Sequence, residues 1–296
     1  MYDHIVIPVD GSDEAAAAAR HGFSLAATFD STVSVLHVVE RRALRLTATE
    51  DERTRLQSSG EAIVDDVAAL APDEVGSVTT DVVEGTPADR ITAYAGDRGA
   101  DLIVVGRQGV SGLGKRLLGG VTERILGRRT TPVAVVPGGA AETAADYARI
   151  LFPTDGSDAA DAAVPHVAAA ARAFGSAVDV LNVVDLQAAG GVFNAGGLEP
   201  AFVDRLERRG RDAVDAAAGE LGASAPEVGI RTAIERATAT GGAAAAVRDY
   251  VDAAGIDLVV MGASGRSNRS RQLLGSVTSS VLRTVAVPVL VVPRSG

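Results

Sequence analysis

Two glycine-rich segments of the sequence share one spacing and could hold a phosphate group. The matching residues are Gly106, Gly109, Gly119, Gly120, Val121 and Thr122 in the first segment, and Gly262, Gly265, Gly275, Ser276, Val277 and Thr278 in the second. Glycine has no side chain, so the backbone can approach a ligand closely. A glycine-rich loop between a strand and a helix favours phosphate binding, because the first N–H groups of the helix lack partners and the helix dipole is positive there. The sequence therefore predicts a phosphate site, or its framework, in each half of the chain.

An acidic turn precedes each glycine-rich segment and predicts the direction of the ligand. Asp10 and Asp155 each follow an apolar run and begin an Asp-Gly-Ser sequence. A carboxylate there would repel phosphate, but it can accept hydrogen bonds from ribose hydroxyls. We therefore expect the sugar and base near Asp10 and the phosphates near Gly109 and Gly119–Thr122. The basic neighbours of the first loop are Arg107, Lys115 and Arg116. The alternatives are plain surface turns at the glycines and a helix N-cap or Asx-turn role for each aspartate.

The elements that would position these residues alternate between strands and helices. In the first half, strands are expected at 4–9, 33–39, 78–83, 101–105 and 133–136, and helices at 13–27, 51–70, 87–97 and 120–128. This alternation predicts βαβ units and a parallel sheet. A strand order of 3-2-1-4-5 would place a crevice between strands 1 and 4, at their carboxyl ends.

The second half repeats the first with one insertion. The segment Ile5–Asp13 recurs 145 residues later, whereas Ala100–Gly106 recurs 156 residues later, so the second copy carries 11 extra residues. We therefore expect an α/β protein of two tandem doubly wound domains, at residues 1–138 and 147–296. Each domain would be a five-stranded parallel sheet with helices on both faces.

Composition argues against several classes of protein. The 296 residues carry a net charge of −10, which disfavours binding to nucleic acid and to anionic membrane surfaces. No apolar run approaches the ~18 residues of a membrane span. The absence of cysteine excludes disulfides and thiol catalysis. The chain enters a strand at once and leaves no room for a signal peptide, so we expect a cytoplasmic protein.

No motif in the chain predicts a catalytic or metal site. Gly109–Arg116 nearly matches a P-loop, but Arg116 stands where a P-loop has the hydroxyl that binds Mg²⁺. The four histidines show no metal-ligand spacing, and no G-x-S-x-G elbow is present. Rapid turnover is therefore not expected, although slow ATP hydrolysis stays open.

The whole chain resembles a tandem universal stress protein. The resemblance rests on the glycine spacing, on the Pro-x-Asp-Gly-Ser start of each half, and on Glu84–Ala88 before the third helix. It implies a stress-response protein that binds an adenine nucleotide in one or both domains, ATP with or without Mg²⁺, and acts as a switch or interaction module rather than as an enzyme. Two alternatives stay open: an adenine-nucleotide hydrolase with the same sheet, and an interaction module without nucleotide.

The resemblance also implies the residues of each nucleotide site. Asp10 and Asp155 would contact the adenosine portion, and Val38 and Val183 would meet adenine through their backbone. In full, the candidates are Pro8, Val9, Asp10, Val38, Gly106, Gly109, Gly119, Gly120, Val121 and Thr122 in the first half, and Pro153, Thr154, Asp155, Val183, Met261, Gly262, Gly265, Gly275, Ser276, Val277 and Thr278 in the second.

Hydroxyl groups distinguish the two expected sites. Those of Ser276 and Thr278 can donate to phosphate oxygens. Gly120 stands where the family pattern has Ser or Thr. One such hydrogen bond contributes about 0.5–1.5 kcal/mol, so we expect the first site to bind roughly tenfold more weakly.

The last strand of each half predicts how the domains associate. Val133–Val136 and Val289–Val292 are apolar, and an unpaired apolar strand edge invites another strand. The resemblance implies pairing through these edges, because family members pair there between subunits. We expect an intramolecular pseudo-dimer, and further assembly into a homodimer stays open.

Overall fold

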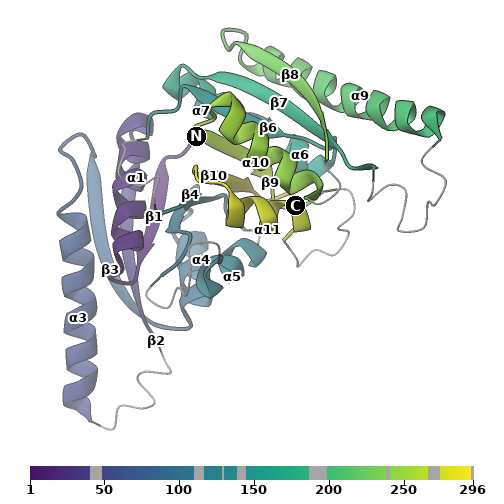
Figure 1. Ribbon diagram of the computed structural model, residues 1–296. Helices are drawn as coiled ribbons and strands as arrows, with labels where there is room; N and C mark the ends of the chain where they lie inside the picture. Colours follow the sequence, from purple (N-terminus) through teal and green to yellow (C-terminus); the bar gives the residue numbers. More distant parts are fainter. Residues whose placement is uncertain are drawn as a thin grey trace. The chain divides into compact units, whose positions relative to one another are not determined.

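The chain forms two compact units, Met1–Ala145 and Asp146–Gly296. The computed structural model describes residues 1–40, 49–109, 117–128, 130–138, 145–186, 199–237, 241–265 and 274–294. Within these ranges each unit alternates parallel strands with helices (Figure 1). Lys115 and Arg116 lie outside the described residues.

The first unit has the strand order that the sequence predicts. Its strands are β1 (His4–Val9), β2 (Thr32–Glu40), β3 (Ser77–Gly85), β4 (Leu102–Gly106) and β5 (Val133–Val136). Its helices in the described ranges are α1 (Asp13–Phe29), α3 (Glu50–Ala68), α4 (Pro87–Asp97) and α5 (Gly120–Arg128). The strands are parallel neighbours in the order β3-β2-β1-β4-β5. The order reverses between β1 and β4, so a crevice can form where these two strands end.

The second unit repeats this order. Its strands are β6 (Arg149–Pro153), β7 (Ala177–Val184), β8 (Ile230–Arg236), β9 (Leu258–Gly262) and β10 (Val289–Val292). Its helices in the described ranges are α6 (Asp158–Asp161), α7 (Val164–Phe174), α9 (Pro200–Ser224), α10 (Gly242–Ala254) and α11 (Ser276–Thr284). The strands are parallel in the order β8-β7-β6-β9-β10. The doubly wound α/β prediction is confirmed for both halves.

Helices cover both faces of each sheet. In the first unit α1 and α3 pack on one face, and α4 packs on the other face beside α5. Every residue of β4 and of β5 is buried, as expected for strands between two helical layers. The carboxyl edge of the sheet is left as the place where side chains from several elements can meet.

The helical segment after the first strand of each unit differs because of one proline. The first unit has a continuous α1, whereas the matching segment of the second unit breaks into α6 and α7. Pro165 stands in the first turn of α7, where its missing N–H costs nothing. In a continuous helix the same proline would remove a hydrogen bond and clash with the preceding turn.

The stability of the second unit should depend on pH through His166 in the first turn of α7. Burial lowers the pKa of the His166 imidazole from 6.5 to about 4. Between these values the unfolded chain binds a proton that the folded chain does not, so stability falls as the pH drops from 6.5 towards 4. The shift corresponds to a loss of up to about 3 kcal/mol. Urea unfolding at pH 7 and pH 4.5 measures this loss. His166→Gln cannot titrate and should show a flatter profile, and equal profiles for both proteins would contradict the prediction.

None of the helices within the described ranges is both long enough and apolar enough to cross a membrane.

Candidate functional site

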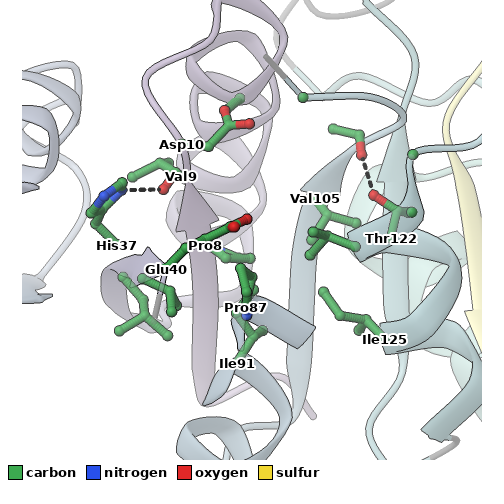
Figure 2. A pocket seen from close by; sticks show the side chains of 18 of the residues that line it. Pro8, Val9, Asp10, His37, Glu40, Pro87, Ile91, Val105, Thr122 and Ile125 are labelled. Atoms are coloured by element: carbon green, nitrogen blue, oxygen red, sulfur yellow. Dashed lines mark hydrogen bonds between the residues drawn. The ribbon is translucent and has the colours of Figure 1, made fainter. Parts of the chain in front are cut away.

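A cavity of about 660 Å³ lies at the carboxyl ends of β1, β2 and β4 in the first unit (Figure 2). Its volume is in the range of small-molecule sites, and it lies where the strand order reverses. All ten candidate residues of the first half line it: Pro8, Val9, Asp10, Val38, Gly106, Gly109, Gly119, Gly120, Val121 and Thr122. The structure therefore brings together residues from the ends of three strands and the start of α5.

Sequence reasoning missed the remaining residues of the wall, apart from His37, for which packing in the core or the crevice wall is the sequence-based interpretation. The remaining residues are Ala15, Leu36, His37, Val39, Glu40, Leu56, Ser59, Pro87, Ile91, Val105, Gln108 and Ile125. Most are apolar residues of strands and helices, which carry no motif and become neighbours only after folding. Glu40 and Pro87 had a usable signal, because one ends a strand and the other begins a helix beside the expected crevice.

The Asp10 carboxylate holds the turn that begins α1. Its Oδ1 accepts hydrogen bonds from the backbone N–H and the hydroxyl of Ser12, at 3.1 and 2.6 Å. The Ser12 hydroxyl in turn caps α1 by accepting from the Ala15 N–H at 3.1 Å. The turn role of Asp10 is therefore present, whereas the N-cap of α1 is Ser12 and not Asp10.

Asp10 also lies directly against the first glycine loop. A Cβ atom placed on Gly109 would overlap Oδ2 of Asp10, and one placed on Gly265 would lie 2.5 Å from Oδ2 of Asp155. The charge argument put Gly109 with the phosphates and Asp10 with the sugar, whereas the structure places the two in contact. A carboxylate so close disfavours phosphate at Gly109, so the start of α5 is the better anion site.

The start of α5 offers a compact set of backbone donors. Gly119 donates its N–H to the Arg107 carbonyl at 2.8 Å and accepts from the Glu123 N–H at 2.9 Å. The next three N–H groups, of Gly120, Val121 and Thr122, begin the helix and so have no carbonyl four residues earlier within it. These N–H groups and the positive end of the helix dipole can hold an anion.

The hydroxyl of Thr278, which we expected to donate to phosphate, and that of Thr122 both donate to a backbone carbonyl. Thr122 Oγ1 donates to the Gly106 carbonyl at 3.0 Å, and Thr278 Oγ1 donates to the Gly262 carbonyl at 3.0 Å (Figure 2 shows the first bond). A hydroxyl has one proton, so Thr278 cannot donate to a phosphate oxygen while this bond exists. Each threonine instead ties the helix that follows the loop to the end of the strand that precedes it.

Gly120 leaves room for the hydroxyl that the first site lacks. A Cβ atom placed on Gly120 has nothing within 4 Å. We expect Gly120→Ser to raise ATP affinity of the first unit by about tenfold, because one hydrogen bond to a charged oxygen is worth about 1.5 kcal/mol. Isothermal titration of a chain whose second site is blocked by Ser276→Asp measures the change. An unchanged affinity would mean that no ligand oxygen lies near this position.

A second acid affects the loop after β4. The Gln108 N–H donates to Glu14 Oε2 at 2.9 Å, and the Gln108 side chain donates to the Leu117 carbonyl at 2.7 Å. Burial lowers the pKa of the Arg107 guanidinium, and the nearby Glu14 carboxylate opposes this shift. In the second unit Ala159 stands at the position of Glu14, so a carboxylate is missing at that position.

Histidine 37 has a structural role in the cavity wall. Its Nδ1 hydrogen-bonds with the Val9 carbonyl at 2.9 Å, which joins the ends of β1 and β2 (Figure 2). In the second unit Asn182 donates to the Thr154 carbonyl at 2.7 Å and makes the same link. Gly60 of α3 faces His37 so closely that a Cβ would lie 2.9 Å from the ring.

The candidates of the second unit occupy matching positions. Pro153 ends β6, Val183 lies in β7, and Met261 and Gly262 end β9. The Asp155 carboxylate accepts from the Ser157 N–H at 3.1 Å, as Asp10 does from Ser12. Gly275 is the N-cap of α11, and its N–H donates to the Ala263 carbonyl at 2.9 Å. This bond matches the one from the Gly119 N–H to the Arg107 carbonyl in the first unit. The other candidates follow at the strand end and in the first turn of α11: Thr154, Gly265, Ser276, Val277 and Thr278.

The described residues contain no group of three or more His, Asp or Glu side chains that could hold a metal ion. The arrangement in the first unit is instead that of a binding cavity: an acidic turn, a helix start rich in N–H donors, and an apolar wall.

Comparison with known proteins defines the class. The model of the universal stress protein family matches residues 1–137 and 146–293, so the chain belongs to this family. A universal stress protein of Mycolicibacterium smegmatis is 28% identical over 303 residues, covering 98% of this chain and 97% of that protein. One from Methanocaldococcus jannaschii is 35% identical over 140 residues, covering 46% of this chain and 82% of that protein. The crystal structure of a universal stress protein from Archaeoglobus fulgidus has the same fold, with a TM-score of 0.69, 19% identity, and coverage of 99% of this chain and 96% of that one.

Proposed function

We propose that each unit binds one adenine nucleotide, with ATP as the preferred ligand. The cavity of the first unit carries this proposal, because it combines N–H donors at the start of α5 with an apolar wall and an acidic turn. The matching strand ends and helix start of the second unit support a second site.

The chemistry of the wall orients the ligand. The phosphates would lie at Gly119–Thr122, where the first N–H groups of α5 and the helix dipole favour negative charge. A ribose hydroxyl would donate to the Asp10 carboxylate. The base would lie against the apolar wall, next to the Val38 backbone. Mg²⁺ would enter with the phosphates.

We assign nucleotide binding and no chemical step to the protein. Family membership indicates no specific catalytic activity. ATP would act by stabilising one arrangement of the loop before α5 and so changing the binding of a partner, which requires different nucleotide affinities for the two arrangements. Cytoplasmic location and homodimer formation stay predictions.

Isothermal titration of the purified full chain with ATP tests the proposal. We expect binding heat with up to two nucleotides per chain, and release of adenine nucleotide when the purified protein is denatured. An absence of heat would reject the ligand. Phosphate release well above background would favour the hydrolase alternative.

A further inference from the structure

The apolar residues in the wall of the first cavity can contact the faces of a planar base. We define the apolar slot as Leu36 and Val38 of β2, Pro87 and Ile91 of α4, and Ile125 of α5, all of which line the cavity. Leu36 and Val38 are alternate strand residues and so share one face of the sheet. Figure 2 shows Pro87 and Ile91 close together, with Thr122 and Ile125 of the neighbouring helix to their right.

Glu40 ends β2 and extends the same row of side chains. It is two residues beyond Val38, so it lies on the face of β2 that carries Leu36 and Val38. It lines the same cavity and is labelled with Pro87 and Ile91 in Figure 2. The described residues therefore place an exposed carboxylate in the wall of the cavity that contains the apolar slot.

The two carboxylates in the described wall of the cavity differ in their partners. Asp10 already accepts two hydrogen bonds from Ser12. Glu40 has no hydrogen-bond or ion-pair partner within the described part of the chain. Its carboxylate is therefore the acceptor that a ligand in the apolar slot can use.

We propose that Glu40 is the residue that selects the base, by accepting a hydrogen bond from the exocyclic amino group of adenine. This inference rests on the proposed nucleotide site. A base in the slot covers Leu36 and Val38 and presents one edge to the end of β2. An amino group there donates to the carboxylate, whereas the carbonyl oxygen of a 6-oxopurine faces it with like charge. A site built around such a hydrogen bond discriminates strongly against a ligand that cannot donate it.

The second unit does not repeat this arrangement. Asp185 stands at the position that matches Glu40, with a side chain one carbon shorter. Its Oδ2 lies 3.5 Å from the Cβ position of Gly242, at the start of α10, where the helix dipole attracts a carboxylate. We therefore assign base selection by this carboxylate to the first unit alone.

The test compares ATP with inosine triphosphate, which carries a carbonyl in place of the amino group. The parent is the full chain with Ser276→Asp, which blocks the second site. We expect the parent to prefer ATP by tenfold or more in isothermal titration. Glu40→Gln keeps the shape but can donate as well as accept, so its preference should fall to about threefold or less. Thermal unfolding of both proteins checks that the fold is unchanged.

Each other outcome overturns the inference in a distinguishable way. If the parent binds ATP and Glu40→Gln keeps the same preference over inosine triphosphate, Glu40 does not select the base. If Glu40→Gln changes only the ratio between ATP and 2′-deoxy-ATP, the carboxylate contacts the sugar. If the parent and the unmodified chain bind no nucleotide, the proposed function fails and the inference fails with it.

Discussion

Replacing Gly120 by aspartate should weaken ATP binding to the first unit by about a hundredfold or more. Gly120 is the first residue of α5, and a Cβ atom there has nothing within 4 Å. The new carboxylate would therefore fit, but it would stand where we place the phosphates. Two like charges about 4 Å apart repel by about 4 kcal/mol at the effective dielectric constant of a protein surface. Even half of this repulsion accounts for most of the expected loss.

This variant separates loss of binding from loss of folding. A carboxylate in the first turn of a helix stabilises the helix by about 0.3–1 kcal/mol, so Gly120→Asp should unfold no earlier than the unmodified chain. Gly120→Asn is the matched control, because asparagine has nearly the size and shape of aspartate without the charge. Titration with ATP in the Ser276→Asp background gives the affinity, and thermal unfolding gives the stability. Full-strength ATP binding by Gly120→Asp would show that the phosphates do not lie at the start of α5.

The fold could be predicted from the sequence because each element carries its own local signal. The predicted strand at 33–39 is β2, Thr32–Glu40, and the predicted helix at 51–70 is α3, Glu50–Ala68. Apolar runs and helical stretches alternate without ambiguity, so only the ends move by one or two residues. The break between α6 and α7 was missed, although Pro165 in the middle of the matching segment was a visible signal.

Among the residues that line the cavity, the sequence could predict those whose place is decided by the backbone topology. Glycine spacing and strand ends identified Gly106, Gly119 and Asp10, because the topology decides where such backbone segments meet. The sequence could not show that the Thr122 hydroxyl donates to the Gly106 carbonyl, because several acceptors lie within reach of such a hydroxyl. Nor could it assemble the apolar slot, whose side chains come from helices and a strand far apart in the sequence.

The first glycine of each motif should affect folding far more than ligand binding. A Cβ atom placed on Gly262 would overlap the Ala159 carbonyl oxygen and lie 2.7 Å from its carbon and 3.1 Å from the Ala160 nitrogen. These are backbone atoms of α6, which cannot rotate away as a side chain can. We therefore expect Gly262→Ala to destabilise the second unit by about 3 kcal/mol or more, as overpacking against a rigid neighbour does.

Two other glycines calibrate this prediction in urea unfolding. Gly106→Ala meets its nearest backbone atoms at 3.1 and 3.2 Å, so its cost should be smaller. Gly219 of α9 has nothing within 4 Å of its Cβ position, and Gly219→Ala should stabilise the helix by up to about 1 kcal/mol. If Gly262→Ala unfolds at the same urea concentration as the unmodified chain, α6 does not pack against the end of β9 as described. If the three variants rank in stability as expected, Gly262 serves helix–strand packing. Ligand contact then falls to the glycines that follow Gly262 in the motif.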